Sequence, residues 1–308
     1  MIMILIMRNG SLPRRAAALA MFMALAALAA LAGCGGDASG ARGKPTVVVT
    51  TAPLGALVSE LVGDTADVRV VIPNNLDPHD FQPSVKDAQR LADADLIVAN
   101  GAGLESSLGD AIHQAESDGV PVFTAADHVP LRDGADDHGA HDPHIWLDPI
   151  RMRDAMDALA PVAATRLGVD LGGRPAALHA RLTALSARLE TMAQTIPPAR
   201  RLLVTGHDSM GYFAARYGFT VVGAVIPSLS SQAEASAAQV ATVVATIRRE
   251  RVPAIFTEVG TPKSVADAIA SDSGARVVPL NTHAVTGGGY EATMRGLMAA
   301  VVGGLGGG

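Results

Sequence analysis

Four of the nine histidines in the chain occupy positions at which a metal ion could be bound. Each follows a run of residues that predicts a β-strand, two in the first half of the chain and two in the second: His79, His144, His207 and His283. Four imidazole nitrogens at about 2.0–2.1 Å from one ion would suit tetrahedral Zn²⁺. Imidazole also suits zinc better than it suits Mn²⁺, which prefers carboxylates. These residue types and their spacing therefore predict a site for a divalent transition metal, with zinc favoured.

The elements that must position these histidines alternate between short β-branched runs and longer amphipathic runs. This order is typical of parallel sheets covered by helices, in which ligands collect outside the carboxyl ends of the strands. The expected strands are 46–51, 67–72, 95–100 and 120–124, then 201–205, 219–225, 254–258 and 276–280. The expected helices are 54–62, 85–92, 104–116 and 149–167, then 210–217, 232–249, 264–270 and 290–301. The sequence therefore predicts an α/β fold of two similar lobes, 46–172 and 199–308.

A single long helix is expected between the lobes, at 174–196 within a connecting segment 173–198. Its apolar residues recur at alternating spacings of four and three, which gives one seam along the helix: Leu178, Leu182, Leu185, Leu189, Met192 and Ile196. Pro197 and Pro198 end it.

Residues 1–33 combine arginines, no acidic residue and an apolar run of small residues, which predicts a secretory signal peptide. A permanent membrane anchor is the alternative, although the run is short for a spanning helix. Cys34 is the sole cysteine, so no intramolecular disulfide can form, and it follows Leu31-Ala32-Gly33 directly. We expect residues 34–45 to be a tether, and an exported protein facing the periplasm or the cell exterior. The net charge of −6 gives no indication of nucleic-acid binding.

Several other residues near these motifs have two interpretations. Asp80, Asp148 and Asp208 could accept hydrogen bonds from the far ring nitrogens of the histidines, which would fix the tautomer. Capping of the following helix is at least as good an explanation for Asp148, which precedes Pro149. Trp146 is expected to pack and not to contact a bare ion.

The remaining histidines have weaker indications of function. His113 and His179 fall within helical runs and are expected at the surface. His128, His138 and His141 lie in an acidic loop, where they could capture a metal loosely and pass it on. A solvated loop without function is an equally good interpretation.

Three segments resemble motifs of the zinc/manganese solute-binding lipoproteins of ABC importers: 77–83 (DPHDFQP), 142–149 (DPHIWLDP) and 205–218 (TGHDSMGYFAARYG). The Leu-Ala-Gly-Cys sequence also resembles a lipobox, which implies a lipid on Cys34. The resemblance implies a rigid connecting helix, a metal held in the cleft between the lobes, and His79, His144 and His207 as ligands. It also implies delivery to an importer permease, by a protein that we expect to be a monomer.

The fourth ligand is where the chain departs from the family. Zinc members have histidine where this chain has His207, whereas manganese members usually have glutamate. Relatives carry an acidic residue where His283 aligns best, and the alternatives are Asn281, Glu258 or water.

A secreted zinc hydrolase is the competing function, because three histidines and a water also describe a catalytic zinc site. It would need an open coordination position and a general base, for which Glu258 is the obvious candidate. The chain has no HExxH motif, and a fourth histidine would close the site. We therefore expect a binding protein and not an enzyme.

Overall fold

The first parallel sheet begins with a run of valines that is buried on both faces. In the computed structural model, which describes residues 43–74, 76–134 and 141–306, β1 (Thr46–Val49) pairs with β2 (Asp67–Val70) and β3 (Leu96–Ala99). β4 (Val122–Thr124) pairs with β3 and completes the order β2-β1-β3-β4. Both faces of such a sheet must be covered, which explains why its central strands are continuously apolar.

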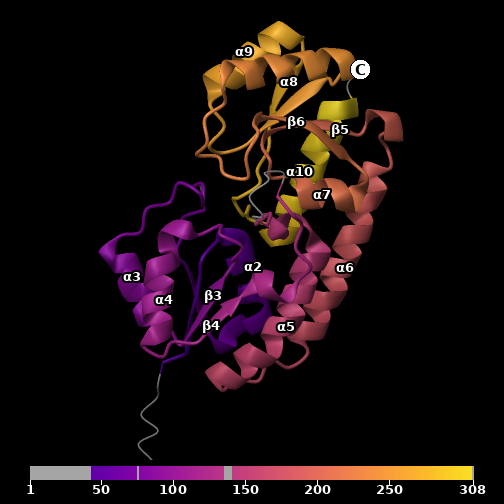
Figure 1. Ribbon diagram of the computed structural model, residues 1–308. Coiled ribbons are helices and arrows are strands. Elements are labelled where there is room, and N and C mark those ends of the chain that lie inside the picture. The colour runs from indigo at the N-terminus through magenta and orange to yellow at the C-terminus, as the bar shows by residue number, and fades with distance from the viewer. Residues whose placement is uncertain (1–42, 75, 135–140, 307–308) are drawn as a thin grey trace, which may run out of the picture. The chain divides into compact units, whose positions relative to one another are not determined.

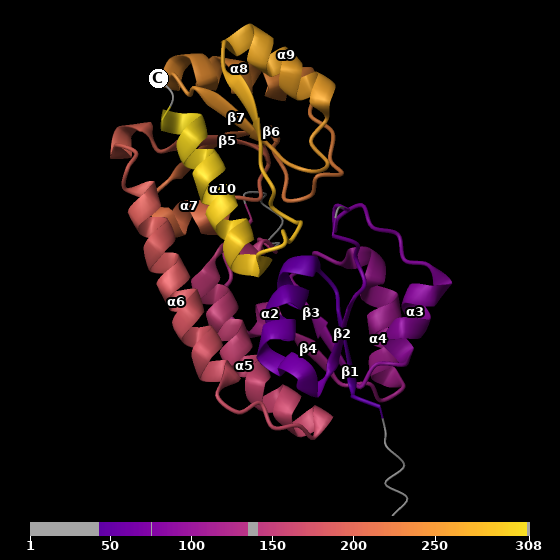
Figure 2. The ribbon, with the colours of Figure 1, turned by 180° about the vertical axis from the view of Figure 1, so that it is seen from behind.

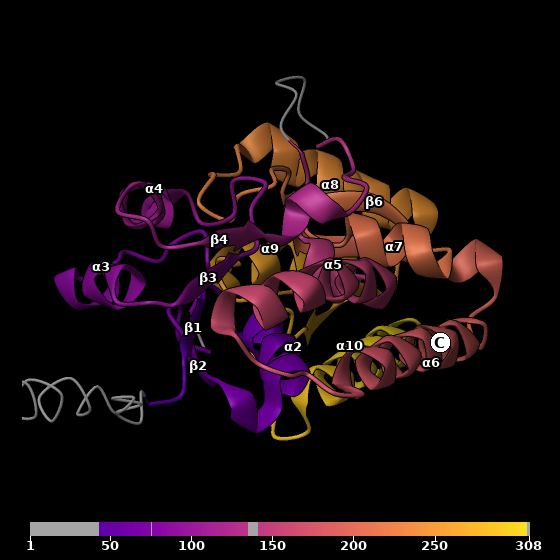
Figure 3. The same ribbon diagram turned by 90° about the horizontal axis from the view of Figure 1, so that it is seen from below.

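Alternate residues of β1 face different helices. Val47 and Val49 belong to the apolar cluster that includes α2 (Ala52–Val62) and α5 (Pro149–Leu167), whereas Val48 packs with α3 (Val85–Ala92) and α4 (Gly109–Ser117). Figure 3 shows these two pairs of helices on opposite faces of the sheet. Residues 1–42 are outside the described part of the chain, so the predicted signal peptide, Cys34 and most of the tether are as well.

The second sheet repeats the strand order of the first. β5 (Leu202–His207) pairs with β6 (Thr220–Ile226) and β7 (Ala254–Thr257), and β8 (Arg276–Pro279) completes the parallel order β6-β5-β7-β8. α7 (Gly211–Tyr217), α8 (Ala237–Glu250), α9 (Lys263–Ser273) and α10 (Gly289–Gly306) surround it (Figure 1). The predicted α/β fold of two similar lobes is confirmed.

The long helix between the lobes is α6 (Arg174–Ala193). The four leucines of its predicted seam are buried, and the helix packs against α2 and α5 of the first lobe and against α7 and α10 of the second (Figure 2). It ends three residues earlier than predicted, at Ala193, although Ile196 is still buried. One apolar cluster therefore continues from the first lobe through α6 into the second.

Several element boundaries differ from the prediction, including the start of α4 at Gly109 and the end of α10 at Gly306. The predicted helix 232–249 begins only at Ala237, because the Ser236 side chain and Gln239 form a capping box that fixes its first turn. β5 continues two residues beyond its predicted end, so His207 is the last residue of this strand and does not follow it. Of the helices in the described part of the chain, none has both the length and the apolarity to cross a bilayer.

Candidate metal site

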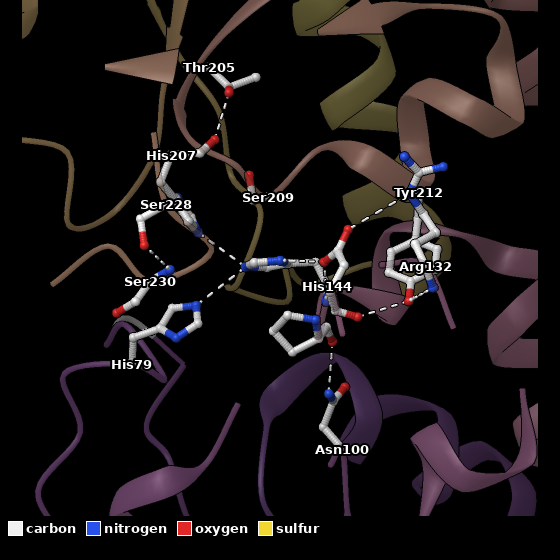
Figure 4. Close-up of polar contacts among 12 residues, drawn as sticks. His79, Asn100, Arg132, His144, Thr205, His207, Ser209, Tyr212, Ser228 and Ser230 are labelled. Carbon is white, nitrogen blue, oxygen red and sulfur yellow. Dashed lines mark hydrogen bonds and ion pairs between the residues drawn. The ribbon is translucent and has the colours of Figure 1, made fainter. Parts of the chain in front are cut away.

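Three of the four predicted histidines converge from different elements. His79 lies in the loop after β2, His144 begins a short 3₁₀ turn (Ile145–Leu147), and His207 ends β5. The Nε2 atom of His144 lies 3.3 Å from that of His79 and 3.1 Å from that of His207 (Figure 4). Two nitrogens bound to one tetrahedral Zn²⁺ would be about 3.3 Å apart. These two distances match the spacing that a single ion would impose, and the ligand atoms of all three residues lie within 4.8 Å of one another.

The Asp142 carboxylate orients His144. Its Oδ1 atom accepts a hydrogen bond from the backbone N–H of His144 at 3.0 Å and lies 2.8 Å from Nδ1 of the ring. A proton on Nδ1 leaves the lone pair on Nε2, which faces the other two histidines. Tyr212 of α7 donates from its hydroxyl to the backbone oxygen of Asp142 and so holds this segment against the second lobe. The sequence analysis did not identify Asp142 as a partner of His144. The Asp-Pro-His pattern occurs twice and could have identified it, because in both copies the aspartate accepts a hydrogen bond from the backbone N–H of the histidine two residues later.

The three aspartates that were expected to act as acceptors behave differently. Asp148 caps α5 by accepting from the N–H of Ile150, and it also pairs with Arg151 and Arg216, so the capping alternative is confirmed. Asp80 is exposed. Asp208 adds to the negative charge near the His207 ring.

Burial keeps two of the imidazoles neutral. It lowers the pKa of His79 to about 3, with a further contribution from the repulsion that positive charge on His144 and His207 would exert. The pKa of His144, which is completely buried, is held well below its usual value for the same reasons. Neutral imidazole is the form that binds metal.

His207 differs because a carboxylate lies behind it. Burial by itself would lower its pKa, but Glu258, Asp77 and Asp208 together outweigh burial and raise it; Oε1 of Glu258 lies 3.3 Å from Nδ1 of the ring. Burial would likewise raise the pKa of the Glu258 carboxyl, whereas His207, His283 and the hydroxyl of Ser209 bring it down to about 2. Ser209 donates to this carboxylate at 2.7 and 2.8 Å. Glu258 is therefore an ionised partner on the far side of His207.

His283 is buried beside the three converging rings. Its ring is nearly parallel to that of His207, at 12°, with the centroids 6.4 Å apart. Nδ1 lies 2.9 Å from the hydroxyl of Thr282, and Nε2 is buried without a hydrogen-bond partner among the described residues. His283 is not in the group whose ligand atoms all lie within 4.8 Å of one another, which comprises His79, His144 and His207.

The side chain of Asn281, the alternative to His283, is engaged in its own turn. Its amide nitrogen donates to the carbonyl of Ala284, and its oxygen accepts from the N–H of the same residue. Trp146 packs as expected, with its ring centroid 5.2 Å from that of His144 and 5.4 Å from that of His283. The indole N–H donates a hydrogen bond to the carbonyl of Thr282.

The other described histidines lie apart from this group. His113 and His128 are exposed and line a cavity of about 740 Å³, and His128 stacks on Phe123. His179 is exposed beside Asp157. His141 pairs with Asp133 at the base of the acidic loop, whereas His138 lies outside the described residues.

The chain resembles known proteins over nearly all of the described residues. Residues 47–304 match the family model for the periplasmic component A of zinc-uptake complexes, ZnuA. The zinc-binding protein TroA of Treponema pallidum is 28% identical over 76% of this chain and 77% of its own length. The zinc-uptake protein ZnuA of Bacillus subtilis is 30% identical over 80% of this chain and 81% of its own length. The manganese-binding lipoprotein MntA of Halalkalibacterium halodurans is 28% identical over 79% of this chain and 81% of its own length. The solved structure of TroA superposes with a TM-score of 0.76 at 26% identity, over 85% of this chain and 99% of TroA.

Proposed function

Because the chain belongs to the ZnuA family of zinc-uptake components, which are solute-binding proteins of ABC importers and not enzymes, we propose that it captures Zn²⁺ through His79, His144, His207 and His283. The bound ion is passed to the permease of the importer. Relatives are named for zinc and for manganese, so the choice of zinc rests on the donor atoms of this chain.

One observation carries the proposal: the three buried or half-buried imidazoles form a cluster in which Nε2 of His144 lies 3.3 Å from Nε2 of His79 and 3.1 Å from Nε2 of His207, as two donors to one ion would. All three donors are nitrogen atoms, and the two nearby carboxylates of Asp142 and Glu258 face the Nδ1 atoms behind the rings. A site built this way favours zinc over manganese, which binds more readily to oxygen.

His283 is the fourth ligand in this proposal. Support comes from its buried Nε2, which lacks a partner among the described residues, and from its position next to His207. An unpaired buried polar atom is unfavourable, and coordination of a metal would satisfy it. A shift of the 281–285 loop is required to bring this atom to the other three.

The position of Glu258 does not support the alternative of a zinc hydrolase. A general base must reach a metal-bound water, whereas this carboxylate accepts from Ser209 and faces Nδ1 of His207. Family membership also places the chain among binding proteins.

We further propose that residues 1–33 are a signal peptide and that a lipid on Cys34 holds the protein at the membrane through the tether 34–45. Relatives such as MntA are named lipoproteins, which supports an anchor. The working unit is a monomer with lobes 46–172 and 199–308 joined by segment 173–198.

The test is competitive binding of Zn²⁺ and Mn²⁺ to the purified protein and to His207→Ala and His283→Ala, with the exposed His179→Ala as the control. We expect one tightly bound zinc in the parent and in the control, and weaker binding in both site variants. Equal zinc and manganese affinity would contradict the proposed selectivity. Normal binding by His283→Ala would remove this residue from the ligand set.

A further inference from the structure

Metal release must separate residues that come from different lobes. His79 lies between β2 and α3 among residues 71–74 and 76–84, which we call the His79 loop, and it belongs to the first lobe. His207 and His283 belong to the second lobe. An ion held by all of them leaves only when the His79 loop moves away from the second lobe, so contacts of this loop across the lobes oppose release.

The first such contact is made by the carboxylate of Asp77, which is buried. Its Oδ1 atom accepts from the N–H of His79, and its Oδ2 atom accepts from the hydroxyl of Ser231 in the second lobe at 2.6 Å. Ser231 is itself buried. Gly260 lies directly against this pair, since a Cβ atom there would be 2.3 Å from Oδ2 of Asp77. One carboxylate thus joins the backbone of a proposed ligand to the opposite lobe.

The second contact is made by Asn74, near the start of the same loop. Its amide nitrogen donates to the carbonyl of Val285 at 2.9 Å, and its oxygen accepts from the N–H of Val285 at 2.6 Å. Val285 lies two residues after His283. This pair of bonds ties the His79 loop to the loop that carries the proposed fourth ligand.

We propose that these two contacts form an interlobe latch, Asp77–Ser231 and Asn74–Val285, which holds the His79 loop closed and sets the rate at which the metal dissociates. The inference rests on the proposed function of the site. Asp77, Ser231 and Asn74 act as positioning residues: they do not touch the ion, and they act through the loops that carry His79 and His283. Because the bonds must break before the ion can leave, their loss accelerates release more than it affects capture.

The experiment measures zinc dissociation and association rates by stopped flow with an excess of a chromogenic chelator. We expect Ser231→Ala and Asn74→Ala each to release zinc about tenfold faster, the usual effect of losing one hydrogen bond to a charged group or a pair of neutral ones, with association changed less than about twofold. Ser230→Ala is the matched control, because its hydroxyl lies in the same loop and accepts from the N–H of Gln232. It should release zinc at the parental rate.

A thermodynamic cycle separates the latch from a general loss of structure. In an Asp77→Ala background, Ser231→Ala should cause no further acceleration if the two side chains act through their mutual bond, and each metal-free variant should still unfold in a single cooperative transition. Independent effects of the two substitutions would overturn the proposal. Parental release rates in Ser231→Ala and Asn74→Ala, with zinc bound normally, would refute the latch and leave the proposed function intact. Absence of zinc binding in the parent would refute both.

Discussion

Replacement of Asp142 by asparagine should weaken zinc binding and at the same time stabilise the metal-free fold. Asp142→Asn keeps the size of the side chain and an oxygen that can accept from His144, but it removes the negative charge 2.8 Å from Nδ1. A charged acceptor makes the ring a better donor to the metal, and loss of such a partner typically reduces metal affinity about 10- to 100-fold. This corresponds to about 1.4–2.7 kcal/mol of binding free energy.

The opposite effect on folding follows from the pKa of the same carboxyl. Burial raises it from 3.8 to about 6, because only a few per cent of the side chain is exposed. A raised pKa means that the folded state holds this proton more tightly than the unfolded state. Its contribution to stability is therefore present below pH 3.8 and is lost as the pH rises through 6. At pH 7 the ionised group costs at most about 3 kcal/mol, and Asp142→Asn removes this cost.

The assay combines zinc competition with denaturant unfolding of the metal-free protein at pH 5 and pH 7. Asp148→Asn is the matched control, since Asp148 is also buried but pairs with Arg216 and Arg151 and caps α5. It should lower stability and leave zinc affinity within about twofold of the parent, because none of these partners is a proposed ligand. Unchanged zinc affinity in Asp142→Asn, or an equal loss in both variants, would refute the reasoning.

Two further predictions concern pH and packing. Zinc affinity should fall about tenfold for each pH unit below the pKa of His207, because its raised pKa keeps a proton on the ring that zinc must displace, whereas His79 stays neutral down to about pH 3. At a pH below the pKa of His207, calorimetry in buffers of different ionisation enthalpy should find about one proton released per zinc, and release of no proton at any pH down to about 5 would contradict this assignment. Gly304→Ala should destabilise the fold by about 1–3 kcal/mol, since a Cβ there would lie 2.5 Å from the Phe256 ring. Gly303→Ala has open space and should be neutral or stabilising by up to about 1 kcal/mol; equal melting temperatures for the two variants would show that the ring yields without strain.

The sequence alone determined the order of the elements and most of the histidine cluster. Periodicity predicts strands and helices because burial of one face is a local property of the chain, and the valines of β1 and the leucine seam of α6 both follow it. The proximity of His79 and His144 was predictable because the carboxyl ends of parallel strands share one edge of a sheet, whereas His207 of the second sheet joined them in the prediction through the resemblance of the three motifs to one family. Asp142 was within reach of the same reasoning, since its bond to His144 spans only two residues.

Only the tertiary structure decided which groups surround these histidines. Glu258 lies behind His207 although 51 positions separate them, and Ser231 reaches Asp77 across 154 positions. No local pattern encodes such contacts: the first depends on the pairing of β5 with β7 within the second sheet, and the second depends on how the two lobes pack through α6 and α10. His283 illustrates the same limit: its motif placed it near the site, but the orientation of its ring beside His207 depends on the packing of Trp146 and Thr282 around it. The types of the proposed ligands were local information, whereas their charge partners and interlobe contacts were products of long-range packing.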